Sequence, residues 1–237
     1  MRKVLLIAAL LALAFTCQAQ YVPTTLSAQQ HGSSASPVIT EFASGTGSAG
    51  TATVTLGSAV TAGYRVLVVT GSNGTNNTPT MTGETFTAYT GATGCQNNVG
   101  FVISCYLITS AVGGQTVVNC SSAGVDINCA AMVINAPQGL SPKDAGGNTL
   151  VTSASLSVAT SAATTNANDL IVGMFFAGAN GVTYTAGSSW TSVLTSGGSD
   201  GSLFVESLAP GSTGVQTATA TGSASANTAE AIIAIKP

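Results

Sequence analysis

The sequence predicts an all-β protein, a two-layer antiparallel β-sandwich of about 12 strands. Three features indicate this fold class. Short apolar or alternating runs recur with turn signals between them, and no segment keeps a 3.6-residue apolar period. Glycine-bearing dipeptides such as Gly113-Gly114 and Asn180-Gly181 provide residues that adopt positive φ, which tight hairpins require.

The strands are expected in two successive groups. The first group comprises the runs 38–43, 51–57, 64–71, 85–89, 101–109, 115–120 and 125–135. A connector with proline and glycine, 137–148, follows, and then come the runs 152–158, 170–178, 189–194, 202–208, 215–221 and 228–236.

The two groups match each other and indicate an internal pseudo-repeat of two halves, 51–136 and 152–237. Phe86 aligns with Trp190, and the run AAMVI at 130–134 aligns with AIIAI at 231–235. Each half alone would bury a small fraction of its surface. We therefore expect a single sandwich domain over 38–237 in preference to two separate domains.

The first 19 residues are expected to be a secretory signal peptide, with Arg2 and Lys3 before an apolar run and small residues before a cut after Ala19. Lipoprotein processing at Cys17 is disfavoured because Phe15 and Thr16 precede it. Residues 20–37 are rich in Ser and Gln and are expected to be extended. The predicted location is secreted, extracellular or on the cell surface, with the periplasm as an alternative.

Charged residues make up 5% of the chain, against about a quarter in an average soluble protein. Without the signal peptide, three basic residues (Arg65, Lys143 and Lys236) remain beside all eight acidic ones. Such a surface excludes nucleic acid and anionic membranes as partners. No later stretch is long and apolar enough for a transmembrane segment.

Four cysteines remain after the signal peptide, and an even count in a secreted chain predicts two disulfides. Of the three connectivities, we favour Cys95–Cys105 with Cys120–Cys129, because CSSAGVDINC is a strand–turn–strand that can bring its two thiols together. No metal site is expected, since there is no CxxC motif and the one histidine, His31, lies in the polar N-terminal segment.

Three segments carry a resemblance to a known group of proteins: TVTLGSAVTAGYRVLVV (53–69), NDLIVGMFFAG (168–178) and the ending GVQTATATGSASANTAEAIIAIKP (214–237). They resemble Thr/Ser/Gly-rich modules that recur in bacterial secreted and cell-surface proteins. The resemblance covers roughly 38–237 and implies a jelly-roll-like β-sandwich. It implies no catalytic residues.

Two short motifs match enzyme signatures only as strings. Gly45-x-Gly47-x-x-Gly50 is followed by a strand and not by the helix that binds a pyrophosphate, so we interpret it as a turn. The G-x-S-x-G string at 197–201 has no histidine after Ser199 and precedes a strand, which excludes a nucleophile elbow. We predict no catalytic residue and no cofactor.

The acidic residues are scattered along the chain: Glu41, Glu84, Asp126, Asp144, Asp169, Asp200, Glu206 and Glu230. Two of them could still meet across strands, as in glycoside hydrolases, which leaves a glycan-active enzyme as the third function considered. A calcium site from Asp144 or Asp169 with loop carbonyls is a further alternative, but no Asp-rich ligand loop supports it.

Aromatic side chains bear on carbohydrate binding, because sugar rings stack on exposed aromatic faces. Trp190 is expected in the core, since it aligns with Phe86. Phe175 and Phe176 are neighbours on one strand and must point to opposite faces. We take Phe176 and Tyr184 as candidate ligand contacts.

Four runs, at 66–69, 130–134, 170–176 and 231–235, are apolar on both faces of their predicted strands. Either small side chains make the outer faces tolerable, or another copy of the protein covers them. The leading hypothesis is a secreted, non-enzymatic structural or adhesive protein of the cell surface or extracellular matrix that self-assembles into filaments or arrays. The alternative is a carbohydrate-binding module, with extracellular polysaccharide as its partner.

Overall fold

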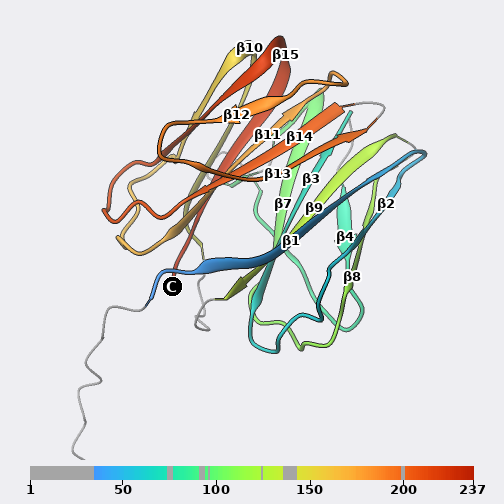
Figure 1. Ribbon diagram of the computed structural model, residues 1–237, viewed down its shortest axis with the longest axis vertical. Helices are drawn as coiled ribbons and strands as arrows, with labels where there is room; N and C mark the ends of the chain where they lie inside the picture. Colours follow the sequence, from blue (N-terminus) through green and yellow to red (C-terminus); the bar gives the residue numbers. More distant parts are fainter. Residues whose placement is uncertain are drawn as a thin grey trace, which may run out of the picture. The chain divides into compact units, whose positions relative to one another are not determined.

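Two large antiparallel sheets carry most of the chain in the computed structural model, which describes residues 35–73, 77–90, 94–95, 97–123, 125–135, 143–198 and 201–237 (Figure 1). The prediction of an all-β, antiparallel fold is confirmed. The first large sheet has the order β1 (Val38–Gly47), β9 (Ile127–Asn135), β3 (Arg65–Ser72), β7 (Phe101–Ile108) and β5 (Thr87–Ala88), with β6 (Asn97–Val99) also paired to β7.

The second large sheet is built from the later part of the chain. Its order is β10 (Lys143–Ala159), β15 (Thr217–Ile235), β11 (Leu170–Ala177), β14 (Gly201–Leu208) and β13 (Thr191–Gly198), with β12 (Tyr184–Ala186) also paired to β15. A small third sheet has the order β2 (Thr51–Thr55), β8 (Val117–Ser121) and β4 (Thr78–Thr80).

The main core lies between the two large sheets. Leu67, Met132 and Leu107 from the first sheet share one buried cluster with Met174 and Phe176 from the second. The two large sheets approach each other closely at Gly71, where an added Cβ would overlap the Phe176 ring. The alternating apolar residues of the central strands therefore form the face-to-face contact of a sandwich.

The outer face of the first large sheet is covered by the small sheet, which we call the first outer layer (β2, β8 and β4). Val54 and Val118 from this layer share a buried cluster with Val66, Val68 and Ile108 of the sheet beneath. The alternation of TATVT and VVNCS, with every second residue buried, matches a layer that has one face inside and one outside.

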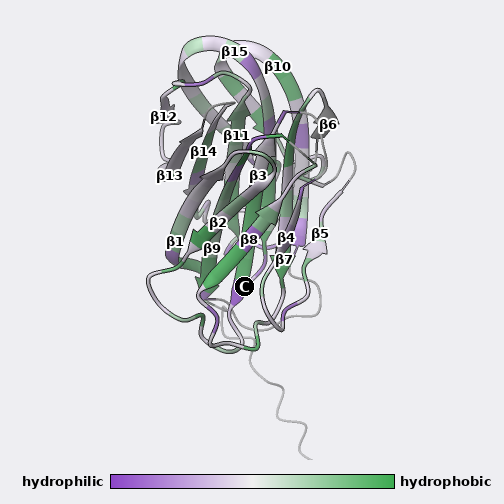
Figure 2. Cartoon of the chain, turned by 90° about the vertical axis from the view of Figure 1, so that its right-hand side faces the viewer, coloured by the Kyte–Doolittle hydropathy of each residue, from purple (hydrophilic) through white to green (hydrophobic). Residues whose placement is uncertain are grey.

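The outer face of the second large sheet is covered by parts of β10 and β15, two strands that also belong to that sheet. Both strands are long and arch over at one end of the molecule (Figure 2). Residues 155–159 and 217–222, with β12, form what we call the second outer layer, in which Leu156 and Ala218 pack on Phe175 and Phe204.

Two expectations are corrected by these outer layers. The sandwich has four layers and not two. The strands that are apolar on both faces are covered neither by small side chains alone nor by another copy, because the outer layers of the same chain bury their second faces. These strands therefore give no support to self-assembly.

The two large sheets also share one pairing pattern. The neighbours β1-β9-β3-β7 of the first sheet correspond in chain order to β10-β15-β11-β14 of the second. The registers agree as well: Val66 lies opposite Val133 and Ile108, and Ile171 lies opposite Ala234 and Leu208.

The outer layers repeat the pattern in their backbone hydrogen bonds. The Leu56 amide donates to the Thr116 carbonyl at 2.8 Å, and the Thr160 amide donates to the Gln216 carbonyl at 2.9 Å. These two bonds lie at matching ends of the β2–β8 and β10–β15 ladders.

The predicted signal peptide 1–19, with Cys17, lies outside the described residues, as do His31 and the segment 20–34. Residues 35–37 belong to no strand. No helix of the described ranges is long and apolar enough to cross a membrane.

Two disulfides join the favoured cysteine pairs. Cys95 is linked to Cys105, with 5.7 Å between their Cα atoms, and Cys120 is linked to Cys129, with 6.2 Å. The second bond connects β8 of the first outer layer to β9 of the large sheet below it.

Candidate functional site

The charged side chains of the described residues are all buried or half-buried, and none is exposed. They are Glu41, Arg65, Glu84, Asp126, Lys143, Asp144, Asp169, Glu206, Glu230 and Lys236, while Asp200 lies outside the described ranges. The outer faces of both outer layers instead carry threonine, serine and asparagine, for example Thr53, Asn119 and Thr217.

Three of the carboxylates accept hydrogen bonds from loop backbone amides. Glu41 accepts from the Ser58 amide at 2.9 Å, Glu84 accepts from the Val112 amide at 2.7 Å, and Asp126 accepts from the Ala49 amide at 3.2 Å. A carboxylate satisfies such an amide with a charge-assisted bond. These acids therefore order loops.

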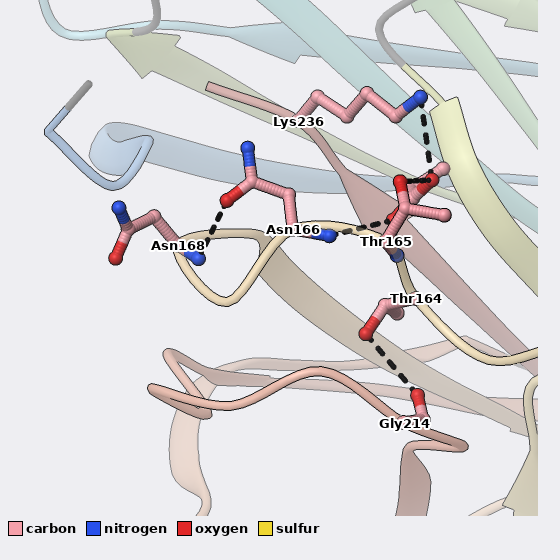
Figure 3. Close-up of polar contacts among 7 residues, drawn as sticks. Thr164, Thr165, Asn166, Asn168, Gly214 and Lys236 are labelled. Carbon is pink, nitrogen blue, oxygen red and sulfur yellow. Dashed lines mark hydrogen bonds and ion pairs between the residues drawn. The ribbon is translucent and has the colours of Figure 1, made fainter. Parts of the chain in front are cut away.

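Asp144 is the centre of a polar cluster at the start of β10, and Figure 3 shows its partners Thr165, Asn166 and Lys236. It accepts hydrogen bonds from the amide and the hydroxyl of Thr165 and from the Asn166 amide, and it forms an ion pair with Lys236 at 3.3 Å. Burial alone would raise the pKa of Asp144, but these bonds outweigh it and bring the pKa to about 2.

Asp169 is fully buried beside Asp144. Burial, followed by the neighbouring Asp144 carboxyl group and its negative charge, raises the pKa of Asp169 to about 7. The two carboxyl groups are neighbours, and Lys236 is the cation paired with Asp144. The described residues include no group of three or more His, Cys, Asp or Glu side chains able to hold a metal.

Arg65 is fully buried, and its guanidinium donates a hydrogen bond to the backbone carbonyl of Lys236. Burial lowers the pKa of Arg65 and the neighbouring Tyr89 raises it. The third basic side chain, Lys143, lies 5.5 Å from the centre of the Tyr89 ring, a cation–π distance. All three basic residues of the described ranges are thus placed in internal contacts.

Glu206 and Glu230 are fully buried between the second large sheet and the second outer layer. Glu206 accepts from the Gly187 amide at 3.1 Å, and Glu230 accepts from the Ser157 amide at 3.2 Å. Burial, only partly offset by these bonds, raises the pKa of each to about 7. They connect an outer layer to a sheet and face no open cleft.

The aromatic residues lie differently from the expectation for a sugar platform. Phe176 is fully buried in the main core, because its strand is covered on both faces, so its ring offers no surface to a ligand. Tyr184 is half-buried, stacks on Phe204 at 5.3 Å between ring centres, and donates its hydroxyl to the Ser202 carbonyl at 3.3 Å. Trp190 packs against the second outer layer's cluster, as expected for a core residue.

The glycine motifs have ordinary structural places. Gly45 and Gly47 lie on β1, and Gly50, with a φ of 95°, precedes β2, so the motif is part of a strand–turn–strand. Gly198 ends β13 and Gly201 begins β14, while Ser199 lies outside the described residues.

A cavity of about 540 Å³ lies beside the first outer layer, and it was not predicted from the sequence. It is lined by Thr78, Pro79, Thr80, Met81, Glu84, Thr85, Phe86, Ala88 and Tyr106. The connection between β4 and β5 spans 81–86, whereas the connection between β12 and β13 spans 187–190 and is two residues shorter.

A scan of the chain against models of protein families, and searches among curated proteins and solved structures, found no match. The functional argument therefore depends on the residues and geometry described above.

Proposed function

We propose that this protein is secreted and non-enzymatic, and that it has a structural or adhesive role at the cell surface or in the extracellular matrix. One observation carries the proposal: every charged side chain of the described ranges is buried or half-buried, while the outer faces present threonine, serine and asparagine. A neutral, hydroxyl-rich surface suits contact with neutral polymers, because neither partner has to lose the hydration of a charge.

The compartment in this proposal is supported by the two disulfide pairs, which persist in oxidising surroundings. The non-enzymatic part is supported by the placement of the acids. Glu206 and Glu230 are buried and bonded to backbone amides, and Asp144 is bonded to Thr165 and Lys236, so none of these three faces a cleft as a free acid or base.

The proposal extends to the architecture: the two halves are copies of one jelly-roll-like unit. In a jelly roll, successive strands alternate between two sheets and the first strand lies beside the last. Within the first half, β1 and β3 lie in the large sheet, β2 and β4 lie in the outer layer, and β1 pairs with β9. The matching registers of the second half support a duplication.

The experiment for the adhesive role is retention of the purified mature protein on insoluble polysaccharides. Microcrystalline cellulose, chitin and an acidic polymer, pectate, are mixed with the protein, and the bound fraction is measured after centrifugation. The proposal expects retention on cellulose or chitin. A protein that stays wholly in solution with every polymer would contradict it.

Self-assembly remains the second candidate for a structural role, now from a different observation. The edge strand β1 exposes 57% of Val38 and 51% of Phe42, and an apolar edge strand favours pairing with another chain. Light scattering of the mature protein tests it. Association that rises with concentration and disappears in Phe42→Glu would support assembly through β1, and a monomer at all concentrations would exclude it.

A further inference from the structure

The cavity between β4 and β5 has a floor and a rim of different chemistry. The floor is buried and apolar, with Pro79, Met81 and the ring of Tyr106. The rim carries exposed hydroxyls, including those of Thr78 and Thr80. Its volume, about 540 Å³, falls within the range of small-ligand sites.

The lining residues limit the chemistry of the ligand. They include no cation, and their one charged side chain is Glu84, so a phosphate or a sugar acid would meet repulsion and no counter-charge. One oxygen of Glu84 accepts from the Val112 amide at 2.7 Å, which fixes the carboxylate in place beside the cavity.

The half-buried ring of Phe86 adds an aromatic surface to the site. An aromatic face together with hydroxyl and carboxylate acceptors suits a sugar ring, which has apolar C–H faces and hydroxyl groups around its edge. A purely apolar ligand would leave the threonine hydroxyls and Glu84 without a role in binding.

The corresponding place in the second half has a shorter connection. Thr78 pairs with Ser121 as Thr185 pairs with Thr221, so β4 and β12 occupy matching positions. In the second half, the shorter connection 187–190 brings Trp190 against the layer's cluster. In the first half, Phe86 of the longer connection packs against the cluster of the first outer layer and also lines the cavity.

We infer that the cavity formed by Thr78, Thr80, Glu84, Phe86 and Tyr106 binds one or two units of a neutral oligosaccharide. This inference rests on the proposed adhesive function and gives it a specific site. Phe86 stacks on the sugar face, and the threonine hydroxyls with the second oxygen of Glu84 bind its hydroxyl groups.

The test is titration calorimetry of the mature full-length chain with three neutral probes (cellohexaose, chitohexaose and xylohexaose) and one acidic probe, a galacturonate hexamer. At least one neutral probe should bind, and the acidic probe should not. The double variant Thr78→Ala/Thr80→Ala should weaken binding by about tenfold, because two neutral hydrogen bonds are lost. Thr80→Trp, which places an indole over the cavity, should abolish binding.

The matched control is Thr185→Ala, the same position in the second half, which should bind like the wild type. Thermal unfolding of each variant verifies folding, and both threonines are exposed, so little change is expected. Failure of all neutral probes, or equal affinity in Thr80→Trp, would overturn the inference. Retention on insoluble polysaccharide that persists in Thr80→Trp would overturn the cavity while leaving the adhesive function standing.

Discussion

Glu230 and Cys129 occupy matching positions in the two large sheets. Cys129 lies opposite Gly45 and Thr70, and Glu230 lies opposite the counterparts of those residues, Thr149 and Phe175. Each side chain connects its sheet to an outer layer. Cys129 does so through its disulfide with Cys120, and Glu230 through a hydrogen bond from the Ser157 amide.

The first prediction concerns the covalent connection. The double variant Cys120→Ala/Cys129→Ala should lose about 2–3 kcal/mol of unfolding free energy, because a short closed loop is released in the unfolded chain. Urea unfolding at equal pH measures it. An unfolding midpoint identical to that of the wild type would show that the disulfide does not hold the first outer layer.

The second prediction concerns the glutamates of the second outer layer. Glu206 and Glu230 have pKa values of about 7 in the folded protein, above the ordinary 4.5, so the folded state binds more protons than the unfolded state between these values. Their stabilising contribution is complete below about pH 4.5 and is lost as the pH rises through about 7. The melting temperature should therefore be higher at about pH 5 than at about pH 8.

The double variant Glu206→Gln/Glu230→Gln is the comparison for this pH effect. Glutamine keeps an oxygen for the Gly187 and Ser157 amides and cannot ionise. Its melting temperature should change less between the two pH values than that of the wild type. An unchanged pH dependence in this variant would assign the effect to other groups.

The third prediction concerns the carboxyl pair. In Asp144→Asn the negative charge beside Asp169 is removed, so the pKa of Asp169 should fall from about 7 toward its ordinary value. Carboxyl carbon NMR across a pH titration follows this group directly. A pKa of Asp169 that stays near 7 would mean that burial alone determines it.

The fourth prediction concerns the contact between the two large sheets. Gly71→Ala places a methyl group into the ring of Phe176 and should cost about 1–3 kcal/mol through overpacking. Phe176→Leu in the same chain should relieve part of that cost. Gly197→Ala, whose new methyl would meet nothing within 4 Å, is the control and should be close to neutral.

The fold class and the cysteine pairs could be predicted from local signals, because period-two alternation, hairpin glycines and short Cys spacing act over neighbouring residues. Such local signals could not predict how the strands that are apolar on both faces are covered. This covering depends on β10 and β15 bending back over their own sheet, and long-range packing of this kind leaves no local pattern in sequences such as 155–159.

The residues of the candidate site, too, could be predicted only in part, because their placement depends on long-range packing. Phe176 was expected at a ligand surface because its neighbour Phe175 had to face the opposite way, but both faces of β11 are buried. The partnership of Asp144 with Lys236 joins residues 92 positions apart, and nothing near either residue indicates it. The cavity at Phe86 was not predicted from the sequence either.

The most direct test of the central claim, that this surface binds neutral partners without forming ion pairs with them, is the salt dependence of retention on insoluble polysaccharide. The bound fraction of the mature protein on cellulose or chitin is measured from about 0.05 M to about 1 M NaCl, a range over which surface electrostatics are almost fully screened. The account predicts a bound fraction that does not fall with added salt. Release of the protein over this range would contradict it.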